Sequence, residues 1–283
     1  MPTDSGPESD VPTVLASRYE IRREVGRGGM ARVYLARDGV TGNLVAIKLL
    51  HRDLYATTMA ERFHREIKVL SRLTHPNIVR ILDSQQDAGA LFFVMEYEQR
   101  ETLRQRLTRD GMLSVERTIA LARDLAAAID YAHGEGVVHR DIKPENILLD
   151  DRRALLCDFG IVRVFGPEAW ERLSSSGLIP GTAAYMAPEQ SVDPARVDGR
   201  SDIYALGCVL YEALMGEPAF AGRTPQAVIS RHLSDTPRPM RTVRPEIPLH
   251  VEQAVHKALA KSPEGRHATA TAFVNALSPD AAA

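Results

Sequence analysis

The spacing of the apolar residues changes near Tyr97, and this change limits the folds that the chain can adopt. Before Tyr97, short apolar runs bounded by turn residues predict strands at 33–36, 45–47 and 91–95, with one helix at about 57–73. After it, apolar residues recur at helical spacing. Helices are predicted there at 114–133, 201–215, 225–233, 250–260 and 269–277. The pattern indicates an α+β fold, in which a small strand-rich lobe precedes a larger helical lobe.

The composition is that of an ordinary globular protein. The 283 residues are 44% hydrophobic and 25% charged, and the net charge of -2 gives no sign of a nucleic-acid or lipid-surface partner. Cys157 and Cys208 are too few for a disulfide framework, and each is expected to be buried and inert in a reducing compartment. No apolar run approaches the ~20 residues of a membrane span, and the acidic N-terminus is unlike a signal peptide. We therefore expect a soluble protein.

Short tails are expected on both sides of a single domain. Residues 1–17 carry three prolines and little that could pack, so a disordered tail is predicted. The domain is expected over 18–277, divided into lobes at about 97–98, and residues 278–283 are expected to fray.

A glycine-rich segment at residues 26–29 (GRGG) lets backbone N–H groups approach phosphate oxygens, because no Cβ stands in the way. With Ala31 it also satisfies a dinucleotide-binding fingerprint, and Asp53 lies where the ribose-binding acid of that motif is expected. That alternative requires the loop to open a helix. Residues 31–37 instead have a strand pattern closed by turn residues, so we predict that the loop joins two antiparallel strands and covers its ligand.

Lys48 ends an apolar strand, and a lysine at such a place is usually a surface residue whose stem packs on the protein. Glu66 changes this interpretation. It lies in the first predicted helix among the apolar residues Phe63, Ile67 and Leu70, so it borders the buried face. An ion pair between Lys48 and Glu66 would hold the ammonium where the phosphates of ATP arrive.

Two polar segments directly follow apolar runs. Residues 139–146 (HRDIKPEN) lie between apolar strand-like residues, and residues 158–160 (DFG) follow Leu155-Leu156-Cys157. A charged run is usually a solvated turn, but here apolar strands present the polar side chains from a buried frame. Two acids and an amide presented in this way can bind Mg²⁺ through oxygen atoms and orient a hydroxyl group.

These motifs, in this order, resemble those of the eukaryotic-type (Hanks-type) Ser/Thr protein kinases, and of their bacterial branch in particular. The resemblance covers about residues 19–277. It is carried by VGRGGMARVYLA, HPNIVRI, VMEY, GTAAYMAPEQ and ALAKSPEGR. It implies a two-lobed fold, with an N-terminal five-stranded antiparallel sheet plus one helix and a larger, mainly helical C-terminal lobe. It also implies transfer of the γ-phosphate of ATP to Ser and Thr hydroxyls of proteins, in bacterial signalling.

The resemblance implies a role for each matched residue. Asp141 is the expected catalytic base, Lys143 lies near the γ-phosphate, and Lys48 binds phosphates while paired with Glu66. The expected ligands of Mg²⁺ or Mn²⁺ are Asn146 and Asp158. The residues expected around ATP are Gly26, Arg27, Gly28, Gly29, Val33, Ala46, Lys48, Met95, Glu96, Tyr97 and Leu148.

Three further structural relationships are implied. Glu189 is expected to pair with Arg266, and Asp202 is expected to anchor the backbone of residues 139–146, which we call the catalytic loop. An apolar column is expected from Leu70, Ile81, His139 and Phe159.

The segment between Gly160 and Ala187 matches the activation loop of such enzymes. Because Arg140 precedes Asp141, a phosphate on this loop is expected to pair with that arginine and order the loop. The candidate phosphosites are Ser174, Ser175 and Ser176. Their phosphorylation is expected in trans, between two copies of the chain in a transient homodimer. Thr182 is expected at the substrate site, in contact with Asp141 and Lys143.

Protein substrates and ATP are the expected partners, and neither nucleic acid nor a membrane span is expected. The chain is expected in the cytoplasm, on its own or as the cytoplasmic part of a longer membrane-anchored protein. The alternative function is that of a pseudokinase, which binds a nucleotide or partner without catalysis. Against it, every chemical position is filled; the one departure in the glycine loop is Ala31, in place of the third glycine.

Overall fold

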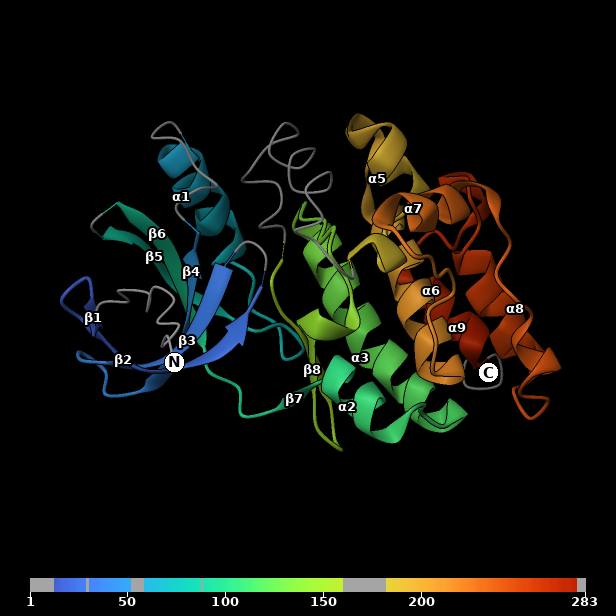
Figure 1. Cartoon of the computed structure of the whole chain (residues 1–283), viewed down its shortest axis with the longest axis horizontal. Coiled ribbons are helices and arrows are strands. Elements are labelled where there is room, and N and C mark those ends of the chain that lie inside the picture. The colour runs from blue at the N-terminus through green and yellow to red at the C-terminus, as the bar shows by residue number, and fades with distance from the viewer. Residues whose placement is uncertain (1–12, 29–30, 52–58, 88, 160–181, 279–283) are drawn as a thin grey trace, which may run out of the picture.

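The computed structural model describes residues 13–28, 31–51, 59–87, 89–159 and 182–278, which form two lobes (Figure 1). The N-terminal lobe is an antiparallel sheet with strand order β1-β2-β3-β4-β6-β5. Its strands are β1 (Val14–Leu15), β2 (Tyr19–Arg27), β3 (Ala31–Asp38), β4 (Leu44–Leu50), β5 (Ile81–Asp87) and β6 (Ala90–Glu96). The sheet therefore has six strands, where five were expected.

The extra strand, β1, comes from the segment that was expected to be a disordered tail. It pairs with the start of β2, where Leu15 lies opposite Tyr19, and both side chains are 1% exposed. The folded domain thus begins before residue 18, because Leu15 packs in one apolar cluster with Tyr19 and Val45 of the sheet. Residues 1–12 lie outside the described ranges.

The turn between β3 and β4 is organised by Asp38, which is buried although it carries a charge. Its carboxylate accepts hydrogen bonds from Nε of Arg18 at 2.7 Å, the backbone N–H of Val40 at 3.0 Å and the hydroxyl of Thr41 at 2.8 Å. The Arg18 guanidinium holds the pKa of Asp38 well below its usual range. The turn residues Val40 and Thr41 thus bind the carboxylate locally, as its turn chemistry predicts, and Arg18 neutralises its charge from just before β2.

Helix α1 (Met59–Leu70) packs on β5, with Phe63 and Ile67 buried on the face toward the sheet. It ends at Leu70, three residues before the end of the predicted helix at 57–73, and residues 57–58 of that prediction lie outside the described ranges.

The C-terminal lobe is mainly helical. Its helices are α2 (Leu103–Asp110), α3 (Val115–Gly134), α5 (Pro188–Val192), α6 (Gly199–Met215), α7 (Pro225–Ser234), α8 (Leu249–Ala258) and α9 (Ala270–Leu277). Ser114 caps α3 by accepting the N–H of Arg117, and Thr269 caps α9 by accepting that of Ala272. The predicted helices of this lobe are confirmed to within two residues at each end.

Helix α6 forms the centre of the lobe, and α3 and α8 pack against it. Every residue from Ser201 to Met215 is buried, which explains why its sequence is apolar on all sides. At Gly207 an added Cβ would stand 2.9 Å from the side chain of Ala258, so this glycine lets α6 and α8 approach closely. Gly216 ends the helix with φ of 73°, a conformation that favours glycine.

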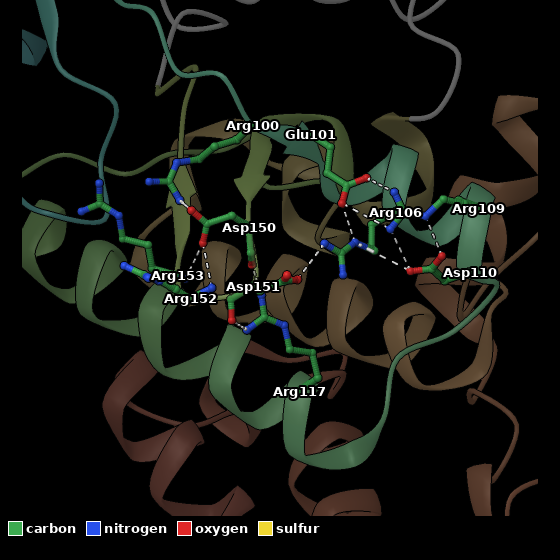
Figure 2. A network of polar contacts seen from close by, with 10 residues as sticks. All are labelled: Arg100, Glu101, Arg106, Arg109, Asp110, Arg117, Asp150, Asp151, Arg152 and Arg153. Atoms are coloured by element: carbon green, nitrogen blue, oxygen red, sulfur yellow. Dashed lines mark hydrogen bonds and ion pairs between the residues drawn. The ribbon is translucent and has the colours of Figure 1, made fainter.

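Between the lobes lies a small sheet of β7 (Glu101–Thr102), β8 (Ile147–Leu149) and β9 (Ala154–Leu156), in the order β7-β8-β9. A network of arginines and acids joins β7, α2, the start of α3 and the turn between β8 and β9 (Figure 2). In it, Arg100 pairs with Asp150, while Arg106 and Arg109 both bind Glu101. Within the described ranges, no helix is long and apolar enough to cross a membrane.

Candidate active site

The loop between α3 and β8 is held by a carboxylate from the central helix. Asp202 of α6 is 1% exposed, and its two oxygens accept the backbone N–H groups of His139 and Arg140, each at 2.8 Å. Gln190 of α5 donates to the carbonyl of Arg140 at 2.9 Å. Arg140 has a φ of 70°, which is rare outside glycine, and these contacts hold it in that conformation. The anchoring role expected for Asp202 is confirmed.

His139 ties this loop to the segment before Asp158. It is buried, and burial lowers its pKa, so the ring is neutral near pH 7. Its Nδ1 accepts the backbone N–H of Asp141 at 3.2 Å, so the ring proton is on Nε2, which donates to the carbonyl of Cys157 at 2.9 Å. The two polar segments identified in the sequence are therefore linked by one imidazole.

Asp141 has one oxygen engaged and one available. Its Oδ2 lies 2.8 Å from Nζ of Lys143 and 3.1 Å from Nδ2 of Asn146, which also donates to the Asp141 carbonyl at 2.8 Å. Burial disfavours the charge of Lys143, but the Asp141 carboxylate more than offsets this and raises the pKa of the ammonium. Oδ1 of Asp141 is buried and has no hydrogen-bond partner among the described residues. This oxygen is positioned to accept a proton from a bound group.

Asp158, like Asp141, has one carboxylate oxygen with a partner and one without a partner among the described residues. Oδ2 forms an ion pair with Nζ of Lys48 at 2.8 Å, while Oδ1 is buried without a partner within the described part of the chain. Its φ of 65° is a second rare backbone conformation for a residue other than glycine. Strained residues of this kind often belong to functional sites, where the surrounding structure holds them.

The expected ion pair between Lys48 and Glu66 is not formed between these two described residues, and this expectation is corrected here. Lys48 contacts Asp158 instead, and Glu66 is half-buried on α1. Nζ of Lys48 lies 2.8 Å from Oδ2 of Asp158, so the carboxylate of Asp158 neutralises this ammonium. Lys48 and Asp158 therefore meet across the cleft between the lobes.

The glycine-rich segment lies between β2 and β3, where Gly26 pairs with Val33 across the antiparallel ladder. The N–H of Gly28 donates to the carbonyl of Ala31 at 2.9 Å and closes the turn. The loop thus joins two strands and does not open a helix, which excludes the dinucleotide-binding alternative. Gly29 lies outside the described ranges.

The other residues expected around a nucleotide lie on β3, β4, β6 and β8 or directly after β6. Val33 pairs with Lys48 between β3 and β4, and Ala46 pairs with Met95 between β4 and β6. Leu148 of β8 packs in one apolar cluster with Met95 from the opposite lobe. Glu96 and Tyr97 follow at the end of β6, where the N–H of Glu96 donates to the carbonyl of Arg80 at 3.0 Å. These residues therefore lie on or next to neighbouring strands of the N-terminal sheet and on β8, which meets that sheet at Met95.

The expected apolar column is present. Leu70, Ile81 and Phe159 line one small cavity together with Met95. The ring of His139 lies against that of Phe159, with their centroids 4.5 Å apart. The column joins α1 and the N-terminal sheet to the catalytic loop.

The expected pair of Glu189 and Arg266 is confirmed as a buried, bidentate ion pair, with N–O distances of 2.7 and 2.8 Å. Ser201 donates to the same carboxylate at 2.6 Å. Burial opposes the charge of Glu189, but Arg266 and then Ser201 outweigh it and lower its pKa. The pair joins α5 to the segment between α8 and α9.

A family model described as the protein kinase domain matches residues 19–276. The chain belongs to the protein kinase domain family. Among curated relatives, the serine/threonine-protein kinase Pkn2 of Myxococcus xanthus is 38% identical over 276 residues, covering 94% of this chain and 33% of the relative. PknB of Mycobacterium tuberculosis is 38% identical over 265 residues, covering 92% of this chain and 42% of the relative. The kinase domain thus spans about a third to two fifths of the length of these relatives.

Solved structures agree on the fold. The kinase domain of PknI from Mycobacterium tuberculosis superposes with a TM-score of 0.77 at 28% identity, covering 97% of this chain and all of that one. Rad53 in complex with AMP-PNP gives a TM-score of 0.76 at 26% identity, covering 92% of this chain and 64% of that one. The expected two-lobed fold and membership of the bacterial Ser/Thr kinase group are confirmed.

The oxygen donors of the kinase domain fit a magnesium ion. Asp158 offers its unpaired Oδ1, and the described hydrogen bonds of the Asn146 side chain use only Nδ2, which leaves its amide oxygen available. Mg²⁺ is commonly held by one or two protein oxygens and completes its shell with water and phosphate oxygens. Among the described residues, no cluster of three or more His, Cys, Asp or Glu side chains could hold a metal by itself.

The sequence did not reveal the contacts of Arg104 on α2. Its guanidinium lies 2.8 Å from Glu145 of the catalytic loop, 2.7 Å from Glu212 of α6 and 2.5 Å from the hydroxyl of Tyr185, which also donates to Glu212. Tyr185 belongs to the 3₁₀ helix η3 (Thr182–Tyr185). One arginine therefore joins α2, α6, η3 and the catalytic loop of the kinase domain. The capping box Thr102–Gln105 is the sequence signal for its helix.

Cys157, beside Asp158, is an unreactive thiol, as expected. It is buried, its Sγ donates to the carbonyl of Asn146 at 3.3 Å, and burial raises its pKa well above the usual value. The thiolate form that reacts with electrophiles is therefore suppressed.

The candidate phosphosites Ser174, Ser175 and Ser176 lie outside the described residues of the kinase domain, and the side chain of Thr182 is likewise not described.

Proposed function

We propose that this kinase domain transfers the γ-phosphate of ATP to Ser and Thr hydroxyls of protein substrates. The observation that carries the proposal is that the two carboxylate oxygens of Asp141 have different contacts. Oδ2 is held by Lys143 and Asn146, while Oδ1 is buried and unpaired among the described residues. A carboxylate oriented in this way can take the proton of a substrate hydroxyl as its oxygen attacks phosphorus.

ATP would lie in the cleft between the lobes. The adenine would pack between Ala46 of the N-terminal lobe and Leu148 of the C-terminal lobe. Met95 and the backbone of Glu96 and Tyr97 would lie beside it. The phosphates would lie beneath the loop at Gly26 and Gly28, close to Lys48. Rad53, which shares the fold, forms a complex with AMP-PNP, and this supports ATP as the nucleotide.

Asn146 and Asp158 would hold Mg²⁺ or Mn²⁺, which neutralises charge on the transferred phosphate when bound. With Asp158 bound to the metal, Lys48 would lose its described partner and be available to the phosphates of ATP. Lys143 would then lie between Asp141 and the transferred phosphate, where its positive charge offsets that of the phosphate oxygens.

Activity on serine and threonine is favoured by Lys143, two residues after Asp141. It is also favoured by Thr182, which precedes the segment Ala187-Pro188-Glu189. The bacterial Ser/Thr kinase relatives carry names that agree with this substrate class. Autophosphorylation in trans at one or more of Ser174, Ser175 and Ser176 belongs to the same proposal, with Arg140 as the partner of the new phosphate. So do a transient homodimer and a position in the cytoplasm.

The proposal is tested with purified chain, radiolabelled ATP, Mg²⁺ and a generic basic protein. Phosphate incorporated into serine and threonine of the acceptor, and lost in Asp141→Asn, is the expected result. Nucleotide binding without transfer, at any concentration of Mg²⁺ or Mn²⁺, would identify a pseudokinase instead.

A further inference from the structure

The turn between β8 and β9 is surrounded by arginines whose charge has no acidic partner. Figure 2 shows Arg117, Arg152 and Arg153 around Asp150 and Asp151. The described side-chain hydrogen bonds of Arg117 and Arg153 go to backbone carbonyls, and Arg152 has none among the described residues. None of the three guanidiniums therefore forms an ion pair with a residue that the structure describes. Arg152 and Arg153 are exposed, and Arg117 is half-buried.

The two acids of the turn already have partners. Oδ1 of Asp150 accepts the backbone N–H groups of residues 152 and 153 at 2.8 and 3.0 Å, and its Oδ2 pairs with Arg100. Asp151 pairs with Arg106 at 3.3 Å. Because both carboxylates neutralise arginines from outside the turn, the charges of the three unpaired guanidiniums remain uncompensated.

Helix α3 holds the turn in one position. Arg117 of this helix donates to the carbonyl of Asp151 at 3.1 Å and also to the carbonyl of Asp150. Asp124 of the same helix accepts the backbone N–H of Ala154, on the other side of the turn, at 2.7 Å. A ligand that binds here therefore has to order only the side chains of the exposed arginines, which keeps the entropy cost of binding small.

Carboxylates are the groups that these arginines fit. A guanidinium is planar, remains charged near neutral pH and can donate two parallel hydrogen bonds to one carboxylate. Asp151, whose side chain is 92% exposed, interrupts the positive surface. A nucleic acid carries a phosphate at every nucleotide and would bring negative charge against that carboxylate. A peptide segment with separated acidic residues avoids this repulsion.

The turn lies at a distance from the reacting groups. Residues 147–149 of β8 separate it from Asn146, whose amide lies 3.1 Å from Asp141. A strand rises ~3.3 Å per residue, so Asn146 and Asp150 are about 13 Å apart along β8. A protein whose hydroxyl reaches Asp141 must therefore extend by several residues before it reaches the turn.

We propose that Arg117, Arg152 and Arg153 form a docking surface for an acidic segment of the protein substrate, several residues away from the serine or threonine that receives the phosphate. The inference rests on the proposed kinase function and names a class of substrates for it. Docking adds affinity for the substrate and does not touch the reacting atoms, so it lowers the KM of the substrate and leaves kcat unchanged.

Steady-state kinetics with two peptides test the proposal. Both peptides contain one serine and a glycine-rich linker of about ten residues, and they end in alternating glycine and either glutamate or glutamine. For the wild type we expect a KM about tenfold lower for the glutamate peptide, with equal kcat. This advantage should disappear in Arg152→Glu/Arg153→Glu. The variant keeps the backbone N–H groups that bind Asp150, so the turn should stay folded.

Arg72→Glu/Arg238→Glu is the matched control. These two arginines are also exposed and also lack an ion pair with a described residue, but they lie after α1 and between α7 and α8. The control should keep the preference for the glutamate peptide. Arg152→Ala/Arg153→Ala repeats the test without the repulsion that the new glutamates add, and the preference should fall there to less than about threefold.

Binding without ATP separates docking from phosphate transfer. Fluorescence anisotropy of a labelled glutamate peptide that lacks the serine should give a Kd about tenfold higher for Arg152→Glu/Arg153→Glu than for the wild type, and the difference should shrink at high salt. An inactive wild type that still binds this peptide would refute the proposed function and leave the docking surface standing.

Equal KM values for the two peptides in the wild type would overturn the proposal, as would a preference kept in Arg152→Glu/Arg153→Glu. Tighter binding of a single-stranded RNA of equal charge would identify a different ligand and also overturn it. A glutamate-peptide KM that falls in the variant would mean that the surface holds the acidic residues 4–10 of the chain itself, against the proposal.

Discussion

Nε2 of His133 on α3 lies 2.8 Å from Oδ2 of Asp202, the same oxygen that accepts the backbone N–H of His139. The buried carboxylate that anchors the catalytic loop thus has an imidazole as its counter-ion. Burial disfavours the charge of His133, but Asp202 more than offsets this and raises the pKa of the ring.

The pair makes stability depend on pH. Because the pKa of His133 is raised on folding, its contribution is complete below the unfolded value of about 6.5 and is lost as the pH rises through the folded pKa. His133→Gln should therefore lower the Tm most at about pH 6 and least at about pH 9. Calorimetry of both proteins across this range provides the measurement. A Tm difference that is constant or grows with pH contradicts the assignment.

Asp141→Asn should lower kcat by about 10²–10⁴-fold, because the amide keeps the size of the carboxylate but cannot accept the hydroxyl proton. The Kd for ATP should change little. Asp151→Asn is the matched control, since the Asp151 side chain is 92% exposed on the β8–β9 turn. A single-turnover rate for Asp141→Asn within about threefold of wild type would refute the role of this residue as base.

Asp158→Ala should remove the dependence of nucleotide affinity on Mg²⁺, because it deletes the unpaired oxygen that fits the metal. The same change frees Lys48 from its ion pair, so binding of ATP without metal should be retained. Titration calorimetry with and without Mg²⁺ measures both effects. An unchanged Mg²⁺ dependence in the variant is incompatible with the proposed metal site.

Arg266→Met should destabilise the domain by about 3–5 kcal/mol, because Glu189 would remain buried without its partner. Replacing both residues by apolar ones should recover part of the loss. Urea denaturation of the two variants provides the comparison. A loss below about 1 kcal/mol in Arg266→Met would mean that water or another cation reaches Glu189.

Replacing Ser174, Ser175 and Ser176 together by alanine should reduce activity and remove phosphate from residues 174–176 after incubation with ATP and Mg²⁺. Phosphopeptide mapping and intact-mass spectrometry make the test, with a mixture of active and Asp141→Asn chains to detect transfer in trans. Full activity of the triple variant would exclude control through these serines.

The sequence predicted the elements that local signals define. Ser114 and Thr269 are helix caps whose side chains accept N–H groups in the structure, and α6 is buried on all sides as its composition requires. The ion pair of Glu189 with Arg266 followed from the family resemblance, as did the anchoring of the His139 backbone by Asp202.

Other contacts had no local signal. The partner of Lys48 depends on the position of α1 relative to Asp158, which sequence spacing does not define. The packing of β1 rests on Leu15 alone, and the contact of His232 with Tyr204 joins residues 28 positions apart. Long-range pairs of this kind are defined only when the helices pack together.

The pairing of Arg100 with Asp150 limits how the two lobes can turn relative to each other (Figure 2). Arg100 also binds Glu98 at 2.9 Å, and β7 follows directly and is paired with β8. The chain is thus fixed to the N-terminal sheet as far as Glu96, and to the C-terminal lobe from Arg100 onward. Any opening or closing of the cleft must therefore be taken up by backbone rotations at residues 97–99, which act as a three-residue pivot.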